Sequence, residues 1–258
     1  DDQFIVALDK QTGKDVWKVK RSTDYRDLDA AGKPKAEGDL RKGYATPQIA
    51  MIEGKPVLLS NGAKAHYGYD PLTGKELWQV ENQPFHSTGA RPIYGHGLIY
   101  FAAGFSKGHF YAIKPPPASA WKAGNILDAS KDSEATPGKP QLVWKLIKGV
   151  PETPSPILHG DLLFLVDNGG IASAVEAKTG KIVWSERLGL KRVYASPICA
   201  EGRIYVADSE GKCVVFAVAP EFKLLGESKL DGSIDASPAA SGKALYIRTA
   251  KTLYRIEQ

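Results

Sequence analysis

An eleven-residue pattern that recurs along the chain constrains the fold more than any other feature. Each copy begins with a small residue, carries an acidic residue at its third place and Thr-Gly-Lys at places six to eight, and ends in Trp. The copies occupy residues 7–17, 68–78 and 174–184. Gly readily adopts the positive φ of a tight turn, and an acidic side chain can accept the backbone N–H groups of that turn. The pattern therefore predicts a β-hairpin with Trp on its second strand.

A second series interleaves with the first and sets the period of the repeat. Five prolines, each followed by a Gly-containing turn and an apolar strand, stand at Pro47, Pro92, Pro156, Pro197 and Pro238. Their gaps of 45, 64, 41 and 41 residues give a base period of about forty. Each period holds four short strands, and 26 Gly and 17 Pro suit the turns between them. A four-stranded sheet cannot bury both faces alone, so we expect sheets packed on one another with Trp between them.

These residues resemble the PQQ-like (quinoprotein alcohol dehydrogenase-like) repeat, whose tryptophan-docking motif is Ala-x-Asp-x-x-Thr-Gly-x-x-x-Trp. The resemblance implies an all-β fold, a β-propeller of four-stranded antiparallel blades of the eight-bladed type. Trp144 matches only the end of the motif, and the last full repeat has Leu224 and Leu225 near the place where Trp is expected. The docking residues implied by the resemblance are Ala7, Asp9, Thr12, Gly13, Trp17, Asp70, Thr73, Gly74, Trp78, Trp144, Thr179, Gly180 and Trp184.

The order of strands predicts how much of a propeller the chain holds. Two strands at 4–9 and 15–20 open it, five blades start at the five prolines, and the last blade ends after its third strand at 252–257. We expect residues 1–258 to form a single propeller domain with about five to six blades, the C-terminal part of a longer ring. A closed six-bladed ring is the alternative. The chain opens with Asp1-Asp2-Gln3, so no signal peptide is visible and the chain is either processed or a fragment.

Two insertions break the period, at 21–43 and 115–140. Both are polar and are predicted to be surface loops. Long loops on a rigid scaffold often carry function, so each either binds a partner or is a loop of tolerated length. Trp121 lies inside the second insertion and is expected either to anchor it or to present a contact surface.

Catalytic chemistry has little support in the residues. The resemblance implies that a quinoprotein enzyme holds PQQ between a Trp and a disulfide of adjacent cysteines, with Ca²⁺ on Glu, Asn and Asp oxygens and an Asp as base. Here Cys199 and Cys213 are the only cysteines, and a disulfide between them is not expected. We therefore predict no catalytic, cofactor-binding or metal-binding residue, with PQQ and Ca²⁺ as the alternative. The histidines, expected on the surface or in loops, are His66, His86, His96, His109 and His159.

Charge and hydropathy limit the partners. The net charge of +5 is spread over mixed Lys, Arg, Asp and Glu, so no nucleic-acid partner is expected. The longest apolar run, 213–219, is too short to span a bilayer. If the first strand of each blade lines the axis, the residues before each Pro face a funnel that could hold an anionic or sugar-like ligand, or could be filled by Arg–carboxylate pairs. These candidate funnel residues are Tyr44, Arg91, Glu152, Arg192, Tyr194 and Asp235.

Taken together, the residues favour a non-catalytic, extracytoplasmic interaction scaffold, periplasmic by resemblance. It would bind a protein partner by strand addition or loop contact. One alternative is a PQQ-dependent quinoprotein dehydrogenase or its remnant. Another is a carbohydrate-binding or sensing propeller module. The sequence leaves the partner and the oligomeric state open.

Overall fold

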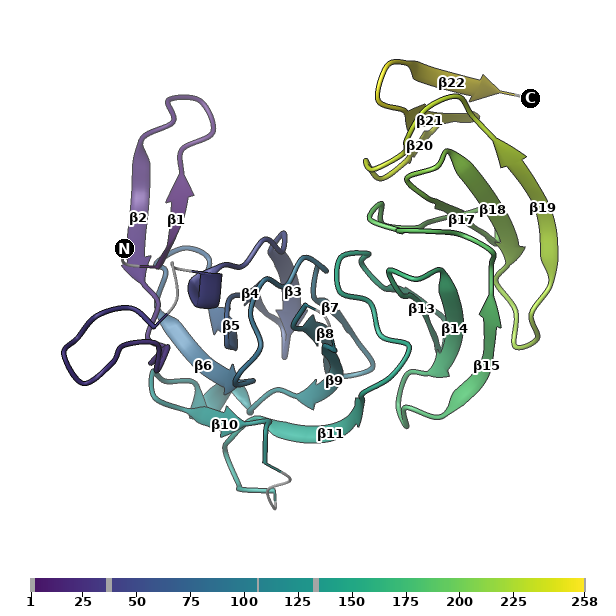
Figure 1. Ribbon diagram of the computed structural model, residues 1–258. Helices are drawn as coiled ribbons and strands as arrows, with labels where there is room; N and C mark the ends of the chain where they lie inside the picture. Colours follow the sequence, from purple (N-terminus) through teal and green to yellow (C-terminus); the bar gives the residue numbers. More distant parts are fainter. Residues whose placement is uncertain (1–2, 36–38, 106, 132–134, 258) are drawn as a thin grey trace. The chain divides into compact units, whose positions relative to one another are not determined.

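The computed structural model describes residues 3–35, 39–105, 107–131 and 135–257 (Figure 1). The chain divides into two compact units, residues 1–145 and 146–258, and each is described by itself. The described residues are built of β-strands, with only two short 3-10 turns, Asp39–Arg41 (η1) and Ala118–Ala120 (η2). None of their helical segments has the length and apolar character needed to cross a membrane.

Unit 1 opens with a two-stranded antiparallel sheet of β1 (Phe4–Leu8) and β2 (Asp15–Lys20). Two larger sheets follow. The first runs β3 (Gln48–Ile52), β4 (Lys55–Asn61), β5 (Ala65–Tyr69), β6 (Glu76–Glu81) and then β10 (Ile126–Asp128). The second runs β7 (Ile93–Gly95), β8 (Leu98–Ala103), β9 (His109–Lys114) and β11 (Gln141–Leu146).

Unit 2 holds three sheets in simple chain order. The first is β12 (Ile157–His159), β13 (Leu162–Val166), β14 (Ile171–Glu176) and β15 (Ile182–Arg187). The second is β16 (Ile198–Ala200), β17 (Arg203–Ala207), β18 (Lys212–Ala217) and β19 (Leu224–Lys229). The third is β20 (Ala239–Ser241), β21 (Ala244–Arg248) and β22 (Leu253–Glu257). The predicted strand order, with two strands first and three last, is confirmed.

The prolines of the second series stand directly before the first strand of their sheets. Each first strand begins at the residue after its proline. Proline has no N–H to give to the ladder, so the strand starts behind it. In unit 2 the serines before these prolines join neighbouring sheets. The N–H of Ser155 donates to Ser196 Oγ at 2.9 Å, and the N–H of Ser196 donates to Ser237 Oγ at 2.9 Å.

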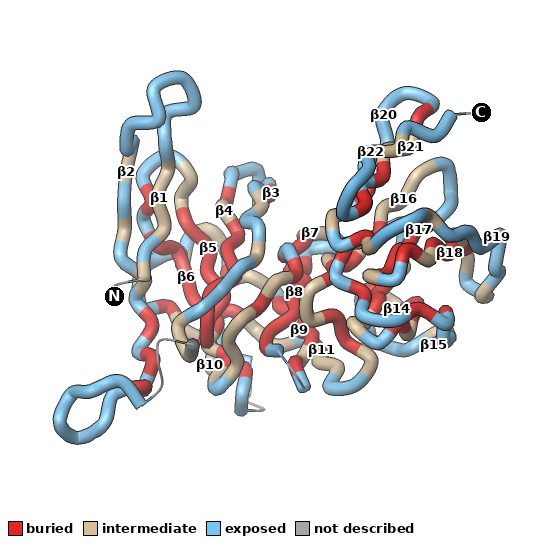
Figure 2. The backbone as a smooth tube through the Cα atoms, turned by 45° about the horizontal axis from the view of Figure 1, so that its top comes forward, coloured by how far each residue is buried: buried red, intermediate tan, exposed pale blue. Residues whose placement is uncertain are grey.

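The cores lie between neighbouring sheets of each unit, where Figure 2 shows the buried backbone. In unit 1, Leu59 and Trp78 of the first large sheet meet Phe101 and Ile113 of the second in one cluster of buried residues. In unit 2, Phe164 and Phe216 belong to one such cluster across the first two sheets. Burial of these side chains is the main stabilising contribution to the stacking of sheets.

The Thr-Gly hairpins form as the pattern predicts. Asp9 Oδ1 accepts the N–H and the hydroxyl of Thr12, both at 2.8 Å, and Gly13 has a φ of 69°. The Thr12 side chain in this way lowers the pKa of Asp9. In the third copy Glu176 takes the place of Asp, and its Oε2 accepts the Thr179 hydroxyl at 2.8 Å. One acidic side chain at the third place is thus enough to close the turn.

Candidate functional site

Both insertions pack on one sheet of unit 1, the β3–β6 sheet, and they are the strongest candidates for a functional surface. The prediction that they are surface loops needs correction, because each contributes buried residues. Residues 36–38 and 132–134 of the insertions lie outside the described residues.

The first insertion begins with residues 21–27, in which burial alternates. Thr23, Tyr25 and Asp27 are buried, whereas the residues between them are exposed. Thr23 hydrogen-bonds through its hydroxyl to Tyr67, and Gln79 Nε2 donates to the same hydroxyl oxygen at 2.8 Å. Side-chain hydrogen bonds rather than a backbone ladder therefore hold this segment on the sheet.

Arg21 fixes the start of this segment. Its guanidinium carbon lies 4.8 Å from the centre of the Tyr67 ring, and its Nη2 donates to Ser60 Oγ at 3.0 Å. Burial raises the pKa of both Tyr67 and Tyr69, so these phenols stay neutral. A cation over a neutral, buried aromatic ring is a stabilising contact.

Ser22 joins the segment to β6. Its hydroxyl hydrogen-bonds to Glu76 Oε2 at 2.6 Å and to Gln79 Oε1 at 2.9 Å. Burial raises the pKa of Glu76, because the charged carboxylate loses its water on this face of the sheet. The Ser22 hydroxyl offsets part of that loss by its hydrogen bond.

Asp27 ends the segment of alternating burial, residues 21–27. Arg41 donates from Nε to Asp27 Oδ2 at 2.6 Å and from Nη2 to Oδ1 at 3.0 Å, a two-point contact that lowers the pKa of the Asp27 carboxyl. The Lys64 ammonium donates to the carbonyl of Tyr25, and burial lowers the pKa of Lys64. A cavity of about 540 Å³ is lined by this part of the chain, including Lys20, Arg21, Asp24, Arg26 and Arg41.

The second insertion carries β10, which was not predicted. It pairs in parallel with β6, with Leu127 opposite Val80. The N–H of Gln79 donates to the Asn125 carbonyl at 2.9 Å, and the N–H of Ala129 donates to the Glu81 carbonyl at 2.8 Å. Because Leu127 and Ala129 are buried in the core cluster of unit 1, this stretch is a structural strand rather than a loop.

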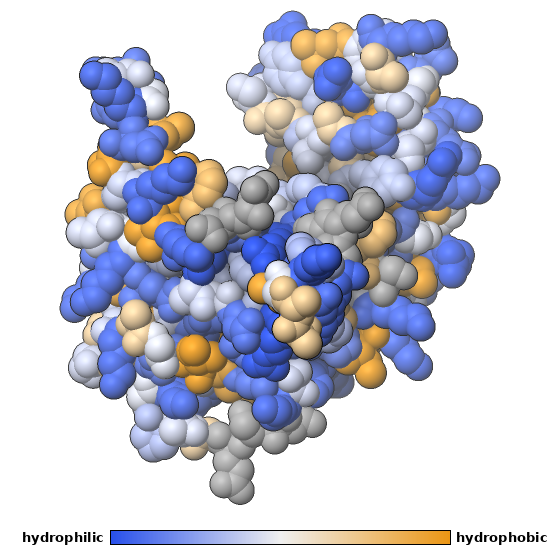
Figure 3. All heavy atoms as spheres, turned by 60° about the vertical axis from the view of Figure 1, so that its left-hand side comes forward, coloured by the Kyte–Doolittle hydropathy of each residue, from blue (hydrophilic) through white to orange (hydrophobic). Residues whose placement is uncertain are grey.

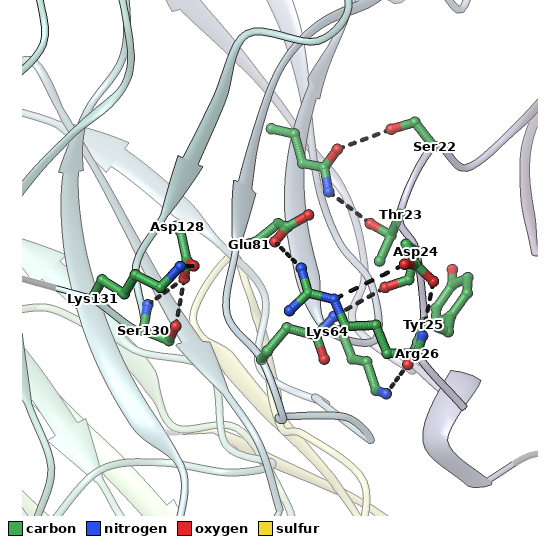
Figure 4. Close-up of polar contacts among 12 residues, drawn as sticks. Ser22, Thr23, Asp24, Tyr25, Arg26, Lys64, Glu81, Asp128, Ser130 and Lys131 are labelled. Carbon is green, nitrogen blue, oxygen red and sulfur yellow. Dashed lines mark hydrogen bonds and ion pairs between the residues drawn. The ribbon is translucent and has the colours of Figure 1, made fainter. Parts of the chain in front are cut away.

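Glu81 is the residue at which the two insertions meet (Figure 4). Its backbone carbonyl accepts from the second insertion, and its carboxylate accepts from Arg26 of the first at 3.3 Å. Beyond it, Asp128 Oδ2 lies 3.0 Å from the Lys131 ammonium. Burial opposes ionisation of Asp128, but hydrogen bonds from Ser130 and Lys131 outweigh it and lower the pKa of that carboxyl. Charged groups from two distant parts of the sequence thus form one polar surface.

The face that Figure 3 shows is mostly hydrophilic, with smaller apolar patches. Within the first insertion, Leu28 stands at the base of the exposed stretch 29–35 and is 45% exposed. Its backbone forms an isolated bridge to Pro34. An exposed leucine beside a polar loop suits a protein contact better than a small-molecule site.

The tryptophans make different contacts in different repeats. Trp17 Nε1 donates to the Pro71 carbonyl at 3.0 Å, and Trp184 Nε1 donates to the Ala219 carbonyl at 3.2 Å. Both acceptors stand two residues after the third strand of the next sheet. Gly74 lies in the turn between β5 and β6, and a Cβ there would lie 2.5 Å from the Trp17 ring. Glycine at this position therefore leaves space for the Trp17 indole. A docking role for the whole motif stays a prediction, for which these contacts give the geometry.

The equivalent carbonyl after β9 belongs to Pro116, and its donor is Trp121 of the second insertion, at 3.0 Å. Trp78 is fully buried, and its Nε1 has no hydrogen-bond partner among the described residues. Trp121 also packs against the core cluster of unit 1, with the Lys55 ammonium 5.7 Å from its ring. Trp121 therefore anchors the insertion. It donates to the carbonyl that corresponds, for Trp78, to the carbonyls bound by Trp17 and Trp184.

Two further residues differ from expectation. Gly226, rather than Leu224 or Leu225, takes the Trp place in its repeat, because it lies opposite Val215 just as Trp184 lies opposite Ala174. The small Gly226 faces the larger Val215, whereas the large Trp184 faces the smaller Ala174. His66, expected on the surface, is fully buried against Phe101, with ring centres 4.5 Å apart, and burial lowers its pKa to about 3.

The candidate funnel residues are divided between the two units. In unit 1, Tyr44 and Arg91 are exposed. In unit 2, Arg192 and Tyr194 are exposed, and Asp235 lines a cavity of about 110 Å³ with Arg248. Glu152 is half-buried, and its N–H donates to Asn168 Oδ1 at 3.2 Å. A funnel shared by all six residues stays a prediction.

A quinone site of the kind found in the resembling enzymes needs an adjacent pair of cysteines and a group of metal ligands. Cys199 in β16 and Cys213 in β18 are free thiols on strands separated by β17, so they do not form the adjacent pair that would stack on a quinone. Among the described residues, no three of His, Cys, Asp and Glu lie close enough to hold a metal ion. The absence of PQQ with Ca²⁺ from this chain stays a prediction, which the two observations above support for the described residues.

The stacked four-stranded sheets, their Trp hairpins and their forty-residue period define a PQQ-like repeat β-propeller, so each sheet is a blade. The family model described as "Outer membrane protein assembly factor BamB" matches residues 1–258. The chain belongs to this family.

Two individual proteins are similar to the chain. The outer membrane protein assembly factor BamB of Legionella pneumophila (strain Paris) is 26% identical over 109 residues, which are 42% of this chain. The match spans only 28% of that protein. The crystal structure of BamB from Moraxella catarrhalis is 14% identical with a TM-score of 0.48, covering 97% of this chain and 77% of that one.

Proposed function

We propose that this chain is a non-catalytic interaction scaffold that works outside the cytoplasm in the assembly of outer membrane proteins. The family match over residues 1–258 supports the assembly role, and the similar Legionella pneumophila protein is itself an outer membrane protein assembly factor. A periplasmic location is part of the proposal on the same grounds. The partner is a protein, held on the polar surface built by the two insertions.

One observation in particular supports the proposal that the chain is an interaction scaffold. The described parts of both insertions are fixed on one blade through Glu81, while the stretch 29–35 beside Leu28 stays exposed. A rigid base with an exposed loop is how β-folds commonly present a binding surface. Removing residues 115–140 would be a poor test, because Leu127 and Ala129 are part of the core.

A sharper test exchanges only exposed residues. In the organism that encodes the chain, residues 29–35 are replaced by a Gly-Ser linker, and Leu28→Asp is made separately. We expect both variants to fold, to lose partner recovery in cross-linking pull-downs, and to lower the amount of assembled outer membrane proteins. Lys251→Glu, an exposed change in unit 2, is the control and should behave as the unchanged protein. Full recovery with both insertion variants would remove this surface from the proposal.

The alternatives have direct tests of their own. A quinoprotein dehydrogenase would show quenching of Trp fluorescence when PQQ and Ca²⁺ are added, together with dye-linked oxidation of an alcohol. A carbohydrate-binding module would respond on a glycan array. We expect neither response.

A further inference from the structure

The outer edge of one blade shows how this fold accepts an additional strand. β10 binds along β6 in parallel, with Ile126, Leu127 and Asp128 opposite Gln79, Val80 and Glu81. The outward N–H of Gln79 is satisfied by this added strand. The backbone row of an outer strand is therefore a working template for strand addition in this molecule.

The equivalent strand of unit 2 is β15, and the hairpin register identifies its matching positions. Trp78 lies opposite Gly68, and Trp184 lies opposite Ala174. Ser185 consequently matches Gln79, and Arg187 matches Glu81. The inner ladder agrees, because the N–H of Leu188 points inward to the Gly170 carbonyl and alternate residues point outward.

The outer side of β15 is open in the described part of unit 2. β15 is the last strand of its sheet, and most of its residues are exposed (Figure 2). No described residue hydrogen-bonds to the outward N–H groups of Ser185 and Arg187. The side chains of Glu186 and Arg187 are exposed, and neither forms an ion pair with a described residue.

The matching edges elsewhere differ in charge. On β6, Glu81 is paired with Arg26, and on β19, Glu227 lies 3.0 Å from Lys212. On β15 the exposed side chains of Glu186 and Arg187, one on each face of the edge strand, form no ion pair with a described residue. Charge complementarity at that edge favours a strand that brings a base opposite Glu186 and an acid opposite Arg187.

We propose that β15 binds an extended segment of a partner protein by parallel strand addition, with a Lys or Arg opposite Glu186 and an Asp or Glu opposite Arg187. The backbone hydrogen bonds give affinity, and the two charges set the register. This inference deepens the proposed function, because it names a second contact and a chemical class for the partner of the scaffold.

The chain itself supplies the probe. A fluorescent decapeptide of residues 122–131 carrying Leu127→Lys places a lysine opposite Glu186 and Asp128 opposite Arg187 in the register of β10. Its binding to the full chain is followed by fluorescence anisotropy. We expect saturable binding that weakens about tenfold with Arg187→Pro, which removes one outward N–H and one charge. Proline is tolerated at such an edge position.

Matched variants keep the test decisive. Lys229→Pro makes the same change on the edge of β19 and should leave binding unchanged, with thermal unfolding confirming that each variant folds. Arg187→Glu should weaken binding, and a peptide that also carries Asp128→Lys should restore it. Absence of binding, equal loss with Lys229→Pro, or failure of the charge exchange overturns the proposal.

Two outcomes separate this inference from neighbouring ones. Light scattering that shows a dimer dissociated by Arg187→Pro would mean that a second copy, rather than a partner segment, occupies β15, and would overturn the proposal. If the peptide fails while the Leu28→Asp variant still loses partner recovery, the inference about β15 fails alone. If the peptide binds as expected but neither insertion variant affects assembly, the proposed function fails and the peptide site stands.

Discussion

The β3–β6 blade of unit 1 and the β12–β15 blade of unit 2 share one repeat but are completed differently. The first has its outer strand covered by β10 and one face covered by residues 21–27, and it buries polar side chains such as Lys64, His66 and Gln79. The second has an open outer strand, and Ser173 is its only buried polar residue within the described part of the blade. The insertions therefore add buried polar contacts to the β3–β6 blade, and the stability of that blade depends on these contacts.

The tryptophans show the same contrast. Trp184 donates its N–H to the next blade and is partly exposed, whereas Trp78 is fully buried without a hydrogen bond among the described residues. Trp121 supplies the missing hydrogen bond from the insertion. In unit 1, full burial belongs to Trp78, and the hydrogen bond to the carbonyl after the third strand belongs to Trp121.

The largest expected effect follows from that division. Trp78→Ala should lower the free energy of unfolding of its unit by about 3–5 kcal/mol, because it removes a fully buried indole and leaves a cavity. Trp184→Ala should cost about 2 kcal/mol, because its side chain is partly exposed. Urea unfolding followed by circular dichroism measures both. Equal losses would break the comparison.

The added strand gives the next effect. Leu127→Ala should destabilise unit 1 by about 2–4 kcal/mol, since Leu127 is buried in the core cluster although it lies in an insertion. Leu225→Ala, on an exposed edge strand of unit 2, is the control and should change stability by less than about 0.5 kcal/mol. If both changes are equally mild, β10 does not hold the blade.

His66 makes the stability of unit 1 depend on pH. Its pKa is about 3 in the folded chain, against about 6.5 when unfolded, so the unfolded state alone gains the proton as the pH falls below about 6.5. The stabilisation is complete above that pH and is lost progressively down to about pH 3. Between pH 7 and pH 5 the wild type should lose about 2 kcal/mol more than His66→Gln. Parallel stability curves for the two proteins would contradict this.

The serine contacts of unit 2 give the smallest effect. Ser196→Ala removes the acceptor for the Ser155 N–H and should cost about 1 kcal/mol. Ser241→Ala, at an exposed position, should change almost nothing. Thermal melts of the two variants provide the measurement, and a loss that is the same in both would show that the contact adds no stability.

The sequence predicts the repeated part of this fold well, because its signals are local. The Thr-Gly hairpins, the apolar strands after each Pro and the strand order all follow from residues close together in the chain. Even the substitution of Glu176 for Asp leaves the hairpin readable, since any carboxylate can accept the Thr179 hydroxyl. These features need no knowledge of distant contacts.

The candidate site was only partly predictable, because its contacts are long-range. Three residues of β10 pair with β6, which lies more than forty residues earlier in the chain. The residue types of Ile126, Leu127 and Asp128 do not indicate which strand they pair with. Residues 21–27 alternate in burial, but the buried ones include Thr23 and Asp27, so they read as a polar loop. A search for alternation without regard to polarity could have found that segment.

Amide hydrogen exchange at two matching positions tests the central contrast most directly. The Gln79 N–H is bonded to the Asn125 carbonyl of the added strand, whereas the outward Ser185 N–H has no partner among the described residues. The account predicts slow exchange at Gln79 and exchange near the rate of an exposed amide at Ser185. Equal protection at the two amides would contradict it.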